Sequence, residues 1–389
     1  MKRNQMLMAN ITHLSGAVLQ AVYDVNHEYL SAQYGEPDST GSIVLAGANA
    51  RGEYPTFDYD AVVLYEKDGR TPGGPSGTLS HAEFYNRLAV LIRQSFEGDP
   101  QSGYAGMGRE MDSRYQYTIF KSFLNAWGVE ENRPMWAVSI NRAEAALKSS
   151  QPVGLILSFL DLMPGAGDMD LAERFIQSTQ EYLADEKHLY TGMAQTLSAY
   201  QFMRQKTAET SPVLDIKGTA GGLRSFHYFL WFLRLYRRLL FMRAGQPRAA
   251  QKPASGLNFL DNLTVLEREF SGTSVRNELT AYYLYLINLR LTMDLFYARN
   301  SKQLPTDSLA LAYFAFYNAT LYRLAEGASP LGFDPAQALP LQEEFLRQLK
   351  QVMTRIDGLI DGLMNDLLSG NFDQVNMHLS QWQSSPELI

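Results

Sequence analysis

The chain contains no cysteine and no long uncharged apolar run. Without cysteine, a disulfide framework, a thiolate zinc site and a cysteine nucleophile are all excluded. No uncharged apolar run approaches the roughly 20 residues that cross a bilayer, so we expect no membrane span. In the first fifteen residues, MKRNQMLMANITHLS, polar residues interrupt what would be the apolar core of a signal peptide. We therefore expect a soluble, cytoplasmic protein.

The charge balance is acidic, with 34 Lys and Arg against 41 Asp and Glu and a formal net charge of -7. This balance disfavours a broad nucleic-acid surface, although a local basic groove stays open as an alternative. The six histidines are scattered without metal-ligand spacing. At 389 residues the chain is long enough for two domains.

Two short strands are predicted near the N-terminus, between two helices. Apolar residues three and four apart predict the first helix over 11–34, ending at Gly35. Ser80 with Glu83 predicts a capping box at the start of the second helix, which runs to about Phe96. The predicted strands are the β-branched runs Ser42–Leu45 and Ala61–Leu64.

Beyond these elements, the pattern changes from mixed to helical. The composition of KDGRTPGGPSGT (67–78) predicts a flexible loop, and 103–117 is expected to supply one or two more strands. After about residue 117 the helical period dominates and no further strand is predicted. The predicted helices cover 171–182, 190–206, 223–242, 257–270, 275–300, 307–326 and 340–368, with a linker over 244–256. This order predicts an α+β fold, with a small α/β domain over 1–160 and an all-helical bundle over 161–389.

The two predicted strands flank a pair of carboxylates in the segment AGANARGEYPTFDYDAVVLY (46–65). Side chains two residues apart in a strand share a face, so Asp58 and Asp60 should repel each other unless a divalent cation lies between them. The small-residue turn at Gly47 and Ala48 would let backbone N–H groups approach a triphosphate. This layout suits phosphoryl or nucleotidyl transfer with Mg²⁺ or Mn²⁺. The alternative is that both aspartates begin a surface strand and are solvated.

A two-metal site also needs a third carboxylate, and GYAGMGREMDSRYQY (103–117) offers candidates. Glu110 and Asp112 share a strand face by parity, and Arg114 lies on the same face, where it would reach a phosphate. The alternative for Asp112 and Arg114 is a surface salt bridge.

These motifs resemble the nucleotidyltransferase signature of glutamine synthetase adenylyltransferase and of the uridylyltransferase acting on the nitrogen-signalling protein PII. Those families carry a Gly-rich turn, an Arg-Gly-Glu or Gly-Arg-Glu step, and then Ser-Asp-x-Asp. Downstream, Asp112-Ser-Arg114 resembles the family's Asp-x-Arg strand, and DIKGTAGGLRSFHYFL (215–230) resembles its Lys-x-x-x-Gly-Gly-Leu/Ile-Arg-Asp segment. Residues 279–291 and 304–312 resemble the closing helices, so about residues 40–330 follow the family order.

The resemblance implies a polymerase-beta-like nucleotidyltransferase domain followed by a helical bundle. It implies Mg²⁺-dependent transfer of a nucleoside monophosphate, with ATP as the expected donor of AMP, to a hydroxyl group of a protein. The catalytic and metal-binding residues that it implies are Asp58, Asp60 and Asp112. The nucleotide-binding residues that it implies are Gly47, Ala48, Arg51 and Arg114.

Four positions depart from the family pattern. Phe57 replaces the usual Ser, Ala48 replaces a second Gly or Ser, Ser225 replaces Asp, and His227 replaces the Glu of the adenylyltransferase. The chain carries a single module, whereas the adenylyltransferase has two, and it contains no His-Asp dipeptide of the uridylyltransferase's hydrolase domain. Two alternatives stay open: a nucleotide-binding or scaffold protein that keeps the fold without catalysis, and a transferase acting on RNA or a small molecule.

Overall fold

The computed structural model describes residues 2–51, 59–98, 111–112, 137–148, 156–210, 215–244, 273–297, 303–325 and 335–369. The chain forms two compact units. Unit 1 contains Met1–Gly192 and Arg237–Phe259, and unit 2 contains Met193–Tyr236 and Leu260–Glu387. The division falls within helix α7 (Glu186–Thr210) and within helix α8 (Leu223–Arg243).

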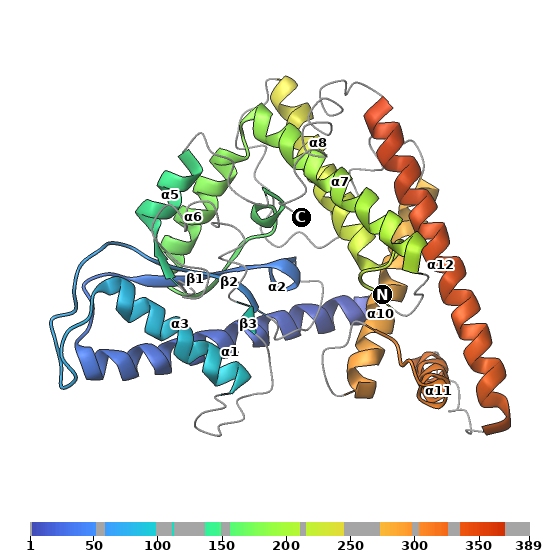
Figure 1. Cartoon of the computed structure of the whole chain (residues 1–389), viewed down its shortest axis with the longest axis horizontal. Coiled ribbons are helices and arrows are strands. Elements are labelled where there is room, and N and C mark those ends of the chain that lie inside the picture. Colours follow the sequence, from blue (N-terminus) through green and yellow to red (C-terminus); the bar gives the residue numbers. More distant parts are fainter. Residues whose placement is uncertain are drawn as a thin grey trace. The chain divides into compact units, whose positions relative to one another are not determined.

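Unit 1 is built on a mixed sheet (Figure 1). The sheet has five strands in the described residues. The strands are β1 (Gly41–Ala46), β2 (Tyr59–Tyr65), β3 (Met111–Asp112), β4 (Ala137–Ser139) and β5 (Met163–Gly167). Strand β1 lies between β2 and β5 and is antiparallel to both. Strand β2 pairs in parallel with β3 through its first two residues and with β4 through its last three. Strands β1 and β2 confirm the two strands predicted around the aspartate pair.

Strands β4 and β5 correct the prediction that no strand follows residue 117. Strand β5 reads Met-Pro-Gly-Ala-Gly and has no β-branched residue, while β4 has only three residues. Both are held by backbone pairing to a buried neighbour, which overrides weak local propensity. Because β5 ends at Gly167, the sheet extends past the domain boundary predicted at residue 160.

The glycine-rich segment 67–78 is a folded turn and not an open loop. The backbone groups of Gly74 and Gly77 exchange two hydrogen bonds of 3.0 Å, and Ser76 N donates to Gln33 O at 2.9 Å. Gly73 and Gly77 have φ values of 102° and 96°, a conformation that only glycine adopts without strain. The glycines that suggested flexibility are therefore what allows this tight turn to fold back on the first helix.

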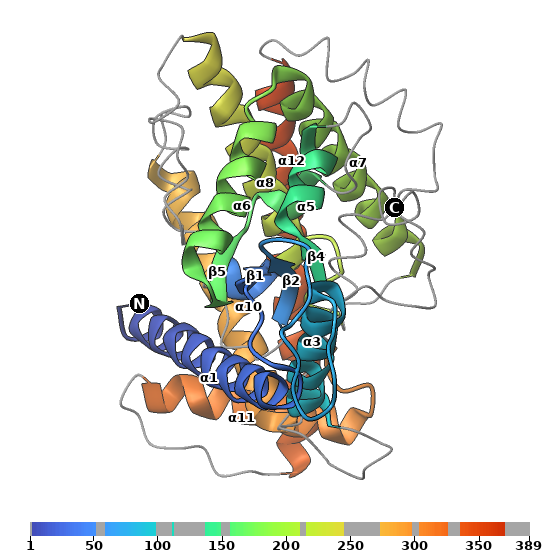
Figure 2. The same ribbon diagram turned by 90° about the vertical axis from the view of Figure 1, so that its left-hand side faces the viewer.

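Helices cover both faces of the sheet, as Figure 1 and Figure 2 show from two directions. One face carries α1 (Lys2–Tyr34) and α3 (His81–Glu97), and the other carries α5 (Ile140–Lys148) and α6 (Met169–Tyr182). The capping box of α3 is confirmed, because Glu83 N donates to Ser80 Oγ at 3.2 Å and Ser80 N donates to Glu83 Oε2 at 2.8 Å. Helix α1 ends before Gly35, whose φ is 81°, as predicted.

The alternation of side chains in β1 and β2 decides which face carries the aspartates. The odd-numbered residues of both strands pack with α1 and α3 in one buried core, which includes Ile43, Leu45, Tyr59, Ala61, Val63 and Tyr65. Successive side chains of a strand point to opposite faces. Asp60 therefore lies on the face of the sheet opposite to this core.

Unit 2 is helical in its described residues. It contains the second part of α7, the first part of α8, and the helices α10 (Thr273–Tyr297), α11 (Ser308–Ala325) and α12 (Pro335–Ser369). These helices confirm the predicted bundle, while the helix predicted at 257–270 lies outside the described residues. The mixed sheet of unit 1 and the helices of unit 2 together give the predicted α+β fold.

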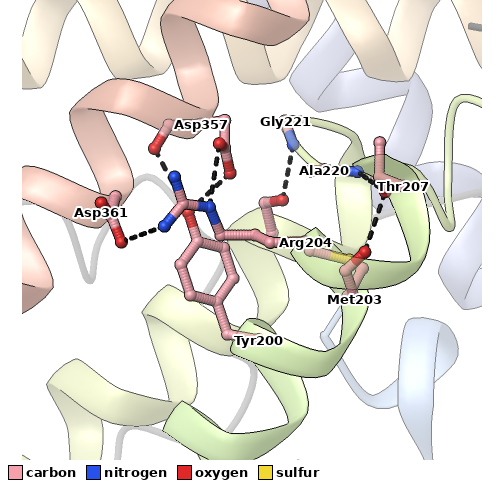
Figure 3. Close-up of polar contacts among 9 residues, drawn as sticks. Tyr200, Met203, Arg204, Thr207, Ala220, Gly221, Asp357 and Asp361 are labelled. Atoms are coloured by element: carbon pink, nitrogen blue, oxygen red, sulfur yellow. Dashed lines mark hydrogen bonds and ion pairs between the residues drawn. The ribbon is translucent and has the colours of Figure 1, made fainter. Parts of the chain in front are cut away.

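An ion-pair network joins α7 to α12 within unit 2 (Figure 3). The Arg204 guanidinium contacts Asp357 at 3.0 Å and Asp361 at 2.6 Å. The Tyr200 hydroxyl donates to Asp357 Oδ1 at 2.8 Å. Burial, and then the charge of the Asp357 carboxylate, raise the pKa of the Tyr200 hydroxyl above its usual value, so this donor stays protonated.

The glycine pair that opens α8 is a tight turn held between α7 and α12. Gly221 has a φ of 77°, and its N–H donates to Ser225 Oγ at 2.8 Å. Ala220 N donates to Thr207 Oγ1 at 2.9 Å (Figure 3). Ser225, which departs from the family pattern, thus closes this turn and is fully buried in it.

Replacing Gly221 by Ala should destabilise unit 2 strongly. A Cβ at this position would lie 1.8 Å from Met353 O of α12, and the positive φ adds backbone strain. We expect a loss of about 3–5 kcal/mol from strain and overpacking, measured by urea unfolding.

The matched control is Gly358→Ala on the same α12, where a Cβ would meet nothing within 4 Å. This change should stabilise the helix by up to about 1 kcal/mol. If Gly221→Ala unfolds at the same urea concentration as the parent, the close approach to Met353 is wrong.

Candidate functional site

Asp60 stands next to Asp112 in the register of the sheet. Asp60 is the second residue of β2 and is half-buried, and it pairs with Ala46 on one side and with Asp112 of β3 on the other. Paired strands lie about 4.8 Å apart, and residues that pair in register belong to the same face. Asp60 and Asp112 thus occupy adjacent positions on one face, which is the placement that two carboxylates sharing a metal need.

Gly47 connects β1 to a short helix, α2 (Gly47–Arg51), and lies directly against Asp60. Its φ is 64°, and a Cβ at this position would lie 2.0 Å from Asp60 Oδ2. Glycine is therefore required twice, once by the backbone conformation and once by the carboxylate beside it. The turn predicted to approach a triphosphate is thus in contact with one of the predicted metal ligands.

A Gly47→Ala variant should lose the geometry of Asp60. The added Cβ would displace the carboxylate, while the positive φ costs about 1–3 kcal/mol of stability. We expect the variant to remain folded but to lose the rise in melting temperature that Mg²⁺ and ATP are expected to give the parent.

Gly77→Ala separates these two effects, because Gly77 has a φ of 96° but a Cβ there would meet nothing within 4 Å. It should lose comparable stability and keep the full response to Mg²⁺ and ATP. Equal responses from the two alanine variants would show that Gly47 does not shape the site.

Arg51 forms a buried ion pair with Asp161. Arg51 Nη1 lies 2.8 Å from Asp161 Oδ2, and the two side chains are 5% and 3% exposed. Arg51 is the last residue of α2, and Asp161 lies just before β5. The predicted contact between Arg51 and a triphosphate stays a prediction, and the structure gives the guanidinium a partner inside the protein.

Sequence reasoning missed Asp161, although the sequence does hold a signal. Asp161 is the only charged residue of LILSFLDLM (155–163). A carboxylate in an apolar segment that is buried needs a cation or several hydrogen-bond donors as partners. That rule would have flagged Asp161, but nothing in the sequence identifies Arg51 as its partner.

Part of the predicted site is not described. Asp58, Arg114, Glu110 and Phe57 lie outside the described residues, and Ala48 and Asp112 are described at the backbone alone. Within the described part of the chain, no three His, Asp or Glu side chains gather as a metal site. Of the predicted metal ligands Asp58, Asp60 and Asp112, the structure thus describes the side chain of Asp60 and the position of Asp112 in the strand register.

A pocket of about 400 Å³ lies elsewhere in unit 1. It is lined by the C-terminal end of α1, by Ser76 and by α3, including Tyr34 and Arg87. The Arg87 guanidinium donates to the Tyr34 hydroxyl at 2.5 Å. Helices α1 and α3 cover the face of the sheet opposite to Asp60, so this pocket is not part of the candidate site.

Among the described helices, none combines the length and the apolar composition that a membrane span requires.

Comparisons with known proteins agree with the resemblance seen in the motifs. The family model described as GlnD PII-uridylyltransferase matches residues 192–364. A bifunctional glutamine synthetase adenylyltransferase/adenylyl-removing enzyme of Hahella chejuensis is 23% identical over 296 residues, which is 72% of this chain. These matches support a nucleotidyltransferase module of this type in the chain. The enzyme of the same name from Burkholderia pseudomallei is 33% identical over 85 residues, or 20% of the chain.

The two kinds of match differ in how much of the chain they cover. The family model begins at the division between the units and covers helices of unit 2, including the Gly221 turn and the Arg204 network. The match to the Hahella protein covers more residues than unit 2 contains, so it includes part of unit 1. The matched regions span 27% of the Hahella protein and 9% of the Burkholderia protein.

Proposed function

We propose that the chain is a Mg²⁺- or Mn²⁺-dependent nucleotidyltransferase that moves AMP from ATP to a hydroxyl group of a protein. The observation that carries the proposal is the register of Asp60 with Asp112 beside the Gly47 turn. The nucleotidyltransferase type of the related proteins supports the reaction class. The names of the curated relatives give a protein, glutamine synthetase, as the target of those enzymes.

The residues of the site would divide the work of the transfer. Asp58, Asp60 and Asp112 would hold the metal, which when bound neutralises charge on the phosphate oxygens. Asp112 would also accept the proton of the acceptor hydroxyl, whose oxygen attacks the α-phosphorus while pyrophosphate leaves. The backbone N–H groups at Gly47 and Ala48 would lie against the triphosphate, and Arg114 would pair with one of its phosphates.

The same proposal places the protein in the cytoplasm and makes a protein its acceptor. The absence of cysteine suits a reducing compartment. The acidic balance disfavours RNA as the acceptor. The buried role of Ser225 removes one argument for a scaffold without catalysis, because that departure from the family pattern serves the turn at Gly221.

The test uses ATP labelled at either the α- or the γ-phosphate. Incubated with Mg²⁺ and a lysate, the chain should transfer the α-label to a protein in acid-stable form and leave the γ-label in pyrophosphate. Transfer of the γ-label alone would indicate a kinase. Label that appears in RNA or in a small molecule would move the acceptor to that class, and no transfer of any label would favour the scaffold.

A further inference from the structure

We propose that the buried Arg51–Asp161 ion pair positions the Gly47–Arg51 turn over the carboxylates of the sheet. The inference rests on the proposed nucleotidyl transfer and adds Asp161 to its residues. Arg51 and Asp161 are positioning residues in this proposal, because they act through the turn and do not touch the substrate.

The Arg51–Asp161 ion pair connects the end of the turn back to the sheet from which the turn begins. Strand β1 leads into α2, which ends at Arg51, and Asp161 leads into β5, which pairs back onto β1 through Leu45 and Met163. The turn is thus fixed at three points. It continues from Ala46, it lies against Asp60 at Gly47, and it is held by Asp161 at Arg51.

A five-residue helix cannot hold its own conformation in water, so α2 depends on its tertiary contacts. A charged hydrogen bond between two buried groups is directional, and it fixes the orientation of α2 more tightly than an apolar contact does. At 5% and 3% exposure, neither side chain is available to solvent. The positive charge of Arg51 is also neutralised by Asp161, which leaves phosphate recognition to backbone N–H groups and to Arg114.

The Asp161→Asn variant distinguishes positioning from direct phosphate contact by the sign of its effect. If Arg51 contacts the triphosphate directly, loss of its carboxylate partner frees the guanidinium, and the KM for ATP stays the same or falls. If the pair positions the turn, kcat/KM for ATP should fall on the order of tenfold to a hundredfold, because small misplacements of a binding group cost this much.

A second variant keeps the test decisive if Asp161→Asn does not fold. The double variant Arg51→Met, Asp161→Leu removes both charges and keeps the site apolar, which buried ion pairs often tolerate without loss of stability. It should fold, as measured by thermal unfolding without ligand, and still lose most of its rise in melting temperature with Mg²⁺ and ATP. Asp161→Glu, which keeps the charge, should restore part of kcat/KM.

The matched control breaks another ion pair of unit 1. Arg174 and Glu144 contact each other at 2.8 Å between α6 and α5, and Glu144→Gln should leave kcat/KM for ATP unchanged. If the parent, the Asp161→Asn variant and the double variant all respond equally to Mg²⁺ and ATP, the positioning inference is overturned and the proposed function stands. A parent with no response at all would overturn the proposed function and this inference with it.

Discussion

Replacing Asp58 and Asp60 together by Asn is expected to abolish both nucleotide transfer and the stabilisation by Mg²⁺ with ATP. Both effects have one cause, because the two carboxylates are the expected anchors of the metal that bridges the triphosphate. A ligand at a hundred times its Kd stabilises a folded protein by about 2.7 kcal/mol, which thermal unfolding detects easily. Without metal the double variant should be as stable as the parent or more stable, because a repulsion between like charges is removed.

The control for this experiment is a change of equal charge away from the sheet. Asp24 and Glu28 are exposed on α1, and Asp24→Asn with Glu28→Gln should leave transfer and the melting response intact. An undiminished response to Mg²⁺ and ATP in the Asp58→Asn, Asp60→Asn variant would place the nucleotide site elsewhere in the chain.

The Asp112→Asn variant should keep its fold and much of its nucleotide binding but lose turnover. Asp112 pairs in register with Asp60, so its carboxylate is expected to complete the metal ligands and to orient the acceptor hydroxyl. Because this interaction is felt mainly in the transition state, kcat should fall on the order of a hundredfold or more while KM for ATP changes little. A surface salt bridge with Arg114 would instead contribute less than about 1 kcal/mol of stability and nothing to transfer.

Glu110→Gln is the internal control, because parity puts Glu110 on the same face but one pleat away. It should transfer at a rate close to that of the parent. If the Glu110→Gln variant transfers no nucleotide and the Asp112→Asn variant still does, the third carboxylate is Glu110. If both variants transfer as the parent does, this strand carries no catalytic acid.

The parts of the fold that local chemistry decides could be predicted from the sequence. The capping box at Ser80 and Glu83, the stop at Gly35 and the two β-branched strands all depend on neighbours in sequence. Strands β4 and β5 could not be predicted, because three residues in one and Met-Pro-Gly-Ala-Gly in the other have little strand propensity. What makes them strands is a partner strand that the sequence places more than seventy residues away.

The features of the candidate site also divide into those that the sequence predicts and those that depend on contacts between distant residues. The shared face of Asp58 and Asp60 follows from parity and the Gly47 turn from composition, so both could be proposed from the sequence. The pairing of Asp60 with Asp112 and the contact of Gly47 with Asp60 depend on the register between strands. The Arg51–Asp161 pair joins residues 110 positions apart and has no motif at all.

Crystals of the chain grown with Mn²⁺ and a non-hydrolysable ATP analogue test the central claim most directly, because the anomalous signal of Mn²⁺ locates the metal independently of any assumed mechanism. The account predicts an anomalous peak bonded to the carboxylates of Asp60 and Asp112, with the triphosphate lying against the Gly47 turn. Metal and nucleotide bound at another place, with Asp60 contacting only protein groups, would contradict it.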